Sequence, residues 1–178
     1  MTTEEIRLLD LHGSSRDAKN MVPISRESIE RMNNTIISNI NDRVKESDVL
    51  YLLGDFCFCK LLSDVAALRN RIVCRNINLI LGNHDSFQRS DYTKIFSFVS
   101  DYFSLKVNGT KLVMSHYPMI AWDCSHYGSL MLHGHCHGNL ENWKKGQENL
   151  SHKLIDVGVD NHDYKPWSFE ELMEWSNA

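Results

Sequence analysis

An apolar strand that ends in polar residues is the feature that most constrains the fold of this chain. Residues 79–81 form an apolar run that breaks at Gly82 and continues as Asn83, His84 and Asp85. In open α/β sheets, ligands collect in the crevice beyond the carboxyl ends of the strands, and this stretch fits that rule. By itself it fits an ordinary turn equally well, because Gly accepts positive φ and Asn and Asp hydrogen-bond their own backbone. Other strands that end in the same way would favour a site.

The hydrophobic pattern predicts an α/β fold in which strands and helices alternate. Strands are expected at 6–9, 49–53 and 79–81, and amphipathic helices at 25–44, with Ser25 as N-cap, and at 61–72. This order is typical of right-handed βαβ units and a parallel sheet.

The second half of the chain predicts a hairpin and two further strands. Asn108-Gly109 is the strongest two-residue turn signal, and it separates apolar segments at 102–107 and 111–114. A short helix is expected at 92–99, strands at 129–132 and 153–157, a polar loop up to Gly146, and a C-terminal helix that a Ser168/Glu171 capping box opens. We see no repeat or linker and expect a single domain over 1–178.

Composition and charge exclude some classes of binding partner. The net charge is −4 with no basic tract, which argues against non-specific duplex binding but not against a nucleotide-sized substrate. Apolar runs are too short for a membrane span, and residues 1–5 lack a secretory pattern, so we expect a cytoplasmic protein without membrane partners. The five cysteines lack paired spacing and are expected to be reduced thiols. The sequence does not predict an oligomeric state.

Five predicted strand ends carry side chains of the kind that bind metals. Carboxylate, imidazole and amide oxygen together suit a borderline divalent ion such as Mn, Fe, Zn or Co. The candidate ligands are Asp10, His12, Asp55, Asn83, His116, His135 and His137. Seven ligands exceed what one tetrahedral ion requires and suit two ions about 3.5–4 Å apart that share a carboxylate.

The ordered motifs resemble those of the calcineurin-like metallophosphoesterase family. They are Asp-x-His, Gly-Asp, Gly-Asn-His-Asp, a single His and Gly-His-x-His, between residues 10 and 138. The tail at 156–160 and the Lys-Pro-Trp at 165–167 look like the small bacterial and phage members. The resemblance implies an αββα sandwich, with central sheets built from βαβ units and a hairpin and flanked by helices.

The resemblance also implies roles for the candidate residues. One metal would be held by Asp10, His12, Asp55 and His137, and the second by Asp55, Asn83, His116 and His135, with Asp55 as the bridge. Mn²⁺ is the expected ion, with Fe, Zn, Co or Ni as alternatives. His84 would act as acid toward the leaving oxygen rather than bind metal, and Asp85 would steady the loop or the imidazole.

These roles predict a phosphoesterase that hydrolyses phosphodiesters or phosphomonoesters by attack of a metal-bridging hydroxide. A small phosphate ester or a nucleotide is the expected substrate. Arg16 and His126 are further candidates for phosphate contacts, although His126 fits a solvated loop residue equally well. Two alternatives are a scaffold protein with a decayed site and a single-zinc hydrolase that uses His135 and His137. The family's usual second Gly-His is replaced here by residues 13–16, which puts the Asp10/His12 pair in doubt.

Overall fold

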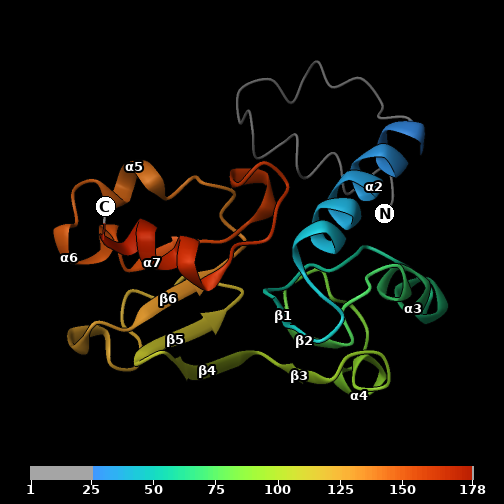
Figure 1. The fold of residues 1–178 in the computed structure, drawn as a ribbon, viewed down its shortest axis with the longest axis horizontal. Helices are drawn as coiled ribbons and strands as arrows, with labels where there is room; N and C mark the ends of the chain where they lie inside the picture. The colour runs from blue at the N-terminus through green and yellow to red at the C-terminus, as the bar shows by residue number, and fades with distance from the viewer. Residues whose placement is uncertain (1–25, 178) are drawn as a thin grey trace.

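The computed structural model describes residues 26–177, which form two sheets with helices packed against them. The first sheet is parallel, in the order β1 (Val49–Leu52), β2 (Asn76–Ile80), β3 (Phe98–Ser100). The second has the order β4 (Tyr102–Val107), β5 (Thr110–Ser115), β6 (Leu130–His133), β7 (Leu154–Asp156). Figure 1 shows the sheets in two halves of the molecule, joined where β3 leads into β4.

The first half forms because apolar strands and helix faces share one core. Helix α2 (Arg26–Arg43) contributes Ile40, and α3 (Leu62–Asn70) contributes Val65, to a cluster with Leu50 of β1 and Leu79 of β2. Both helices were predicted from their apolar spacing, and both predictions are confirmed within the described residues.

The second half is a mixed sheet that opens with the predicted hairpin. Asn108 and Gly109 have φ values of 46° and 91°, the positive φ at both central residues that a type I′ turn requires. β5, β6 and β7 then pair in parallel. Helix α7 (Phe169–Asn177) contributes Leu172 to the cluster on one face of this sheet, and Trp122 joins another cluster with Val113 and Met131.

The capping box at the start of α7 is confirmed atom by atom. The Ser168 hydroxyl accepts from the backbone N–H of Glu171 at 3.2 Å, and the Glu171 carboxylate accepts from the backbone N–H of Ser168 at 2.8 Å. Two orphan donors are therefore satisfied at the helix end, which stabilises its first turn.

The prediction of a helix at 92–99 was wrong. Helix α4 covers only Arg89–Tyr92 and ends where the predicted helix begins. Phe98–Ser100 forms β3, the third strand of the parallel sheet. Tyr92, Phe96 and Val99 are buried in the same core, so a helical turn followed by a strand produces the same apolar spacing as a continuous helix.

The predicted loop up to Gly146 was also wrong in part. It contains α5 (Glu141–Lys144), and α6 (Glu148–Ser151) follows it. Lys144 is buried, and its ammonium group donates to the carbonyl of Leu154 at 2.7 Å. A tertiary contact with β7 therefore orders a segment whose local sequence is polar.

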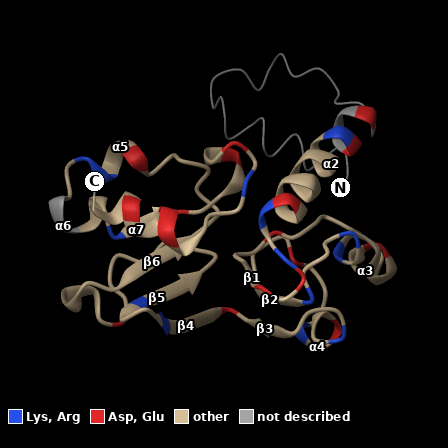
Figure 2. Cartoon of the chain, in the orientation of Figure 1, with Lys and Arg blue, Asp and Glu red and all other residues tan. Residues whose placement is uncertain are grey.

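The described helices include none long and apolar enough to cross a membrane. Basic and acidic residues occur in both halves of the chain (Figure 2). The short elements η2 (Ser125–Tyr127) and η3 (Val159–Asn161) lie in the connections after β5 and β7. The predicted strand at 6–9 and the Ser25 cap lie outside the described residues.

Candidate metal centre

Two glycine turns let the backbone pack closely against predicted ligands of both sheets. Gly54 has a φ of 89°, and a Cβ atom there would lie 2.3 Å from Nδ1 of His116. A Cβ atom on Gly82 would lie 2.2 Å from a carboxylate oxygen of Asp55. Neither position has room for a side chain, because the turns after β1 and β2 pack directly against ligand-type residues.

Three of the predicted ligands adopt backbone conformations that L-residues seldom adopt. Asp55, His135 and His137 have φ values of 55°, 65° and 48°. Such conformations cost roughly 1–3 kcal/mol each and cluster at functional sites. The fold therefore holds these side chains where local backbone preference would not place them.

Four of the predicted ligands meet at one point. One ligand atom from each of Asp55, His116 and His135 lies within 4.8 Å of the other two. The side-chain oxygen of Asn83 lies 2.9 Å from Nε2 of His116, which is 3.3 Å from Oδ2 of Asp55. The ends of β1, β2, β5 and β6 supply these four residues.

The tautomer of His116 shows that this point suits a cation. Its Nδ1 lies 2.8 Å from the carbonyl oxygen of Leu53, a pure acceptor, so Nδ1 carries a proton. In the neutral ring, Nε2 then presents its lone pair toward the oxygens of Asn83 and Asp55. With the Asn83 amide oriented as in this structure, a proton or a metal ion between these three acceptor atoms would satisfy them. An imidazole whose second nitrogen donates to a carbonyl is also the usual arrangement of a metal-binding histidine.

The pKa values near this point favour the same charge distribution. Burial raises the pKa of Asp55, but hydrogen bonds from His116 and from the backbone of His84 outweigh it, so the pKa is lowered. Burial lowers the pKa of His116, but its hydrogen bonds to Asp55 and to the Leu53 carbonyl outweigh it, so the pKa is raised. The site stabilises a carboxylate and a positive charge beside it. Carboxylate, amide and imidazole ligands fit a borderline divalent ion.

His137 is oriented by a residue that sequence reasoning did not single out for a role. Its Nδ1 lies 2.5 Å from Oδ2 of Asp160, and this hydrogen bond is the main cause of the raised pKa of His137. A carboxylate that hydrogen-bonds Nδ1 of a histidine is the supporting half of a carboxylate–histidine–metal triad. The signal available in the sequence was the 156–160 tail, which ends in this aspartate.

Asp85 joins the two glycine turns. Its carboxylate accepts hydrogen bonds from the backbone N–H groups of Asp55 and Gly82, both at 2.9 Å, and of Phe56 at 3.1 Å. Burial raises the pKa of Asp85 despite these bonds. The residue therefore fixes the loop that carries Asp55.

His84 lies beside this loop without being part of the acceptor cluster. Its backbone N–H donates to Oδ1 of Asp55 at 2.9 Å, and its ring packs against Phe58, with centroids 4.2 Å apart. The imidazole is thus held next to the candidate metal centre by an aromatic neighbour that the sequence did not indicate.

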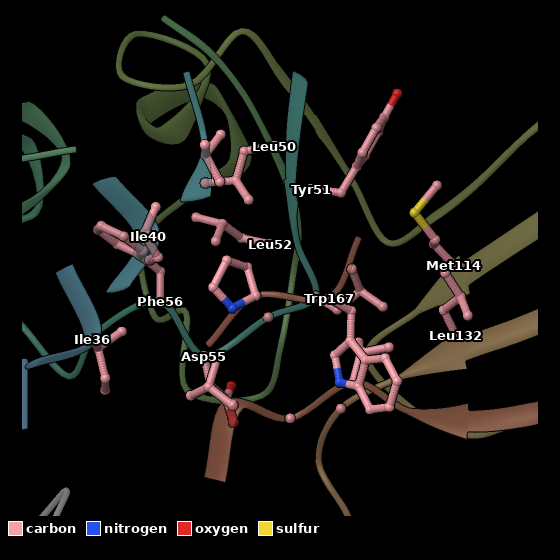
Figure 3. Close-up of a pocket in the computed structure, with 18 of the residues that line it drawn as sticks. Ile36, Ile40, Leu50, Tyr51, Leu52, Asp55, Phe56, Met114, Leu132 and Trp167 are labelled. Atoms are coloured by element: carbon pink, nitrogen blue, oxygen red, sulfur yellow. The ribbon is translucent and has the colours of Figure 1, made fainter. Parts of the chain in front are cut away.

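The described residues leave a cavity of about 1020 Å³ next to these side chains. Figure 3 shows Asp55 at this cavity, with apolar walls from α2 (Ile36 and Ile40), β1 (Leu50 and Leu52) and Trp167. His84, His116, His135 and His137 also line it.

The remaining predicted site residues fall in two groups. His126 is exposed on η2. Asp10, His12 and Arg16 lie outside the described residues. Cys57 and Cys59, which follow Asp55 closely, are free thiols buried in the first core.

Comparison with known proteins identifies the family. A family model described as calcineurin-like phosphoesterase matches residues 10–174. The chain belongs to the calcineurin-like phosphoesterase family. This confirms the resemblance read from the motifs, and the α/β architecture with parallel and mixed sheets agrees with it.

Two similar proteins agree with this family assignment, and neither has a stated substrate. An uncharacterized protein of Methanocaldococcus jannaschii is 29% identical over 148 residues, which is 83% of this chain and 76% of the relative. A crystal structure of a protein of unknown function from Aquifex aeolicus superposes with a TM-score of 0.65 at 22% identity, covering 85% of this chain and 93% of the other. The second match shows the fold alone.

Proposed function

We propose that this phosphoesterase uses two divalent metal ions to hydrolyse a small phosphodiester or phosphomonoester, such as a nucleotide. The observation that carries the proposal is the convergence of ligand-type atoms: those of Asp55, His116 and His135 lie within 4.8 Å of one another, and the side-chain oxygen of Asn83 lies 2.9 Å from Nε2 of His116. Hydrolase chemistry follows from the family, and the donor set supports a pair of borderline ions with Mn²⁺ as the first candidate.

The proposed ligand sets share Asp55. One ion would be held by Asp55, Asn83, His116 and His135, and the other by Asp55 and His137 together with Asp10 and His12. Two such ions would lower the pKa of a water molecule to supply the nucleophile, and would neutralise charge on the phosphate oxygens. The protein's part is to fix the ligands, through Asp85 on one side and Asp160 on the other.

His84 is the proposed acid for the leaving oxygen. Its backbone N–H donates to Asp55 and its ring packs on Phe58, so the imidazole would lie near the ions without completing their ligand set. A protonated imidazole at this place would donate to the departing alkoxide, a role that typically contributes about 10²–10⁴-fold.

Metal content measured together with hydrolysis tests this function. We expect two divalent ions per chain, loss of activity on chelation and recovery with Mn²⁺, using a nitrophenyl monoester and a bis-nitrophenyl diester. Asp10→Asn should lower the occupancy of one ion. Full activity with one tightly bound ion would contradict the dinuclear mechanism, and two ions without hydrolysis of either ester would favour a non-catalytic binding protein.

The leaving group separates proton donation by His84 from metal binding. We expect His84→Ala to keep both ions and to lose about 10²–10⁴-fold on an alkyl ester but clearly less on a nitrophenyl ester, because nitrophenolate leaves without protonation. Equal losses on both esters would indicate phosphate binding instead. Loss of an ion would show that His84 is a ligand.

A further inference from the structure

Tyr117 lies against two of the proposed ligands and is partly open to solvent. Its ring centroid is 4.7 Å from that of His135, at an interplanar angle of 65°, and 5.1 Å from that of His116, at 75°. Both contacts are edge-to-face, a favourable geometry for aromatic pairs. The residue nevertheless remains 48% exposed. About half of Tyr117 is therefore accessible beside the candidate metal centre.

This placement suits a ring that binds substrate. Packing against both imidazoles fixes the Tyr117 ring before any ligand arrives, so little conformational entropy remains to be lost on stacking. Its position next to the ligands, and not among them, corresponds to the part of a substrate just beyond the phosphate. In a nucleoside phosphate the sugar separates the phosphate from a planar base. The π-face of any base can stack on tyrosine.

We infer that Tyr117 is a specificity-determining residue that stacks on the nucleobase of a nucleotide or nucleoside phosphate ester whose phosphate lies at the metal centre. The inference rests on the proposed function and names its substrate class. A net charge of −4 with no basic tract favours a mononucleotide-sized ligand over a long nucleic acid.

Two ligands that differ only in the base provide the test. They are thymidine 5′-phosphate and its abasic 1,2-dideoxyribose 5′-phosphate analogue, titrated calorimetrically into the Mn²⁺-loaded protein. We expect the thymidine compound to bind about tenfold more tightly, since stacking on an aromatic side chain contributes about 1–3 kcal/mol per base. Tyr117→Ala should reduce the ratio of the two dissociation constants to near one, whereas Tyr117→Phe should keep it because the ring is retained. Tyr127→Ala, a change at a 90% exposed tyrosine of the same loop, is the matched control and should keep the ratio.

The same pair can be extended to turnover with their 4-nitrophenyl esters, which share one leaving group. The ratio of kcat/KM should follow the binding ratio across the variants. Equal binding of both phosphates by the unchanged protein would overturn the inference, as would a Tyr117→Ala variant that weakens both ligands equally and keeps the ratio, which is the signature of a purely structural role. Base-dependent binding without hydrolysis of either ester would support the stacking role while contradicting the proposed function.

Discussion

The two halves of the molecule hold their ligand-type side chains by opposite means. In the first half, Asp55 sits on a glycine turn whose backbone N–H groups donate to the carboxylate of Asp85. In the second half, the imidazoles of His116 and His137 are oriented by acceptors, the Leu53 carbonyl and the Asp160 carboxylate. A carboxylate ligand needs its loop fixed, whereas an imidazole ligand needs its ring turned and its tautomer chosen.

The contacts also differ in where they come from. Asp85 lies in the same half as the turns it holds, so its contacts would survive a shift of one sheet against the other. His116 donates across the boundary, from the end of β5 to the residue that follows β1. The positions of the candidate ligands relative to one another therefore depend on how the two halves pack together.

The largest effect is expected from a substitution at Gly54, a turn residue that contacts both halves. A Cβ atom on Gly54 would meet Nδ1 of His116 at 2.3 Å and the backbone of Gly82 at 2.7 Å, at a φ of 89°. Gly54→Ala should lower the free energy of unfolding by roughly 3 kcal/mol or more, and abolish metal binding, because strain and overlap add. Denaturant unfolding and metal analysis measure both effects.

Gly109 provides the control for this change. Its φ is 91°, but a Cβ atom there would have no neighbour within 4 Å. Gly109→Ala should therefore cost only about 1–2 kcal/mol, the price of the left-handed conformation, and leave metal binding intact. Similar losses for the two variants would show that backbone conformation, and not contact with His116, limits the Gly54 position.

The next prediction compares the same Asp→Asn substitution at the two carboxylates that position the ligands, Asp85 and Asp160. Asp85→Asn replaces an acceptor that faces three backbone N–H groups, and Asp160→Asn alters one contact to His137. Both should weaken metal affinity within the range of about 10–100-fold that such supporting residues show, with Asp85→Asn at the upper end. Competition with a metal-sensitive dye gives the affinities. A larger loss for Asp160→Asn would reverse the comparison and make ring orientation the more demanding requirement.

The smallest effect is expected from an ion pair that links the two halves at a position away from the candidate centre. Arg43 of α2 pairs with Glu171 of α7. Burial works against the charge on Glu171, but the hydrogen bonds from Arg43 and the Ser168 N–H outweigh it, so its pKa lies below the ordinary value of 4.5. Glu171→Gln should cost roughly 0.5 kcal/mol at neutral pH, as partly exposed pairs do, and leave activity unchanged.

The pH dependence of that loss has a definite sign. A carboxyl group whose folded-state pKa is depressed contributes stability above its unfolded pKa and loses it as pH falls through the folded value. The difference between the unchanged protein and Glu171→Gln should therefore be constant above pH 4.5 and shrink below it. Thermal unfolding between pH 3 and pH 7 measures this, with exposed Glu170→Gln as the control. A difference that grows in acid would rule out the ion pair as its source.

Local physics explains what could be predicted from the sequence by itself. The Asn108-Gly109 hairpin and the Ser168/Glu171 capping box are decided by residues within a few positions of one another, and both were predicted correctly. The strands that end at Gly54 and at Gly82 were identified because apolar runs and turn residues are adjacent in the chain. The order of motifs then indicated the family. The placement of Asp10 and His12 stays a prediction, because those residues lie outside the described part of the chain.

Only the tertiary structure decided the features that depend on segments far apart in the sequence. Phe98–Ser100 is a strand because β2 lies beside it, and the apolar spacing of that segment fits a helix equally well. The tautomer of His116 is set by the carbonyl of Leu53, the orientation of His137 by Asp160, and the position of the Tyr117 ring by the imidazoles it packs against. Residue type is written in the sequence. The protonated nitrogen of each histidine and the orientation of each ring depend on hydrogen bonds and packing. Those contacts form only when the two halves meet.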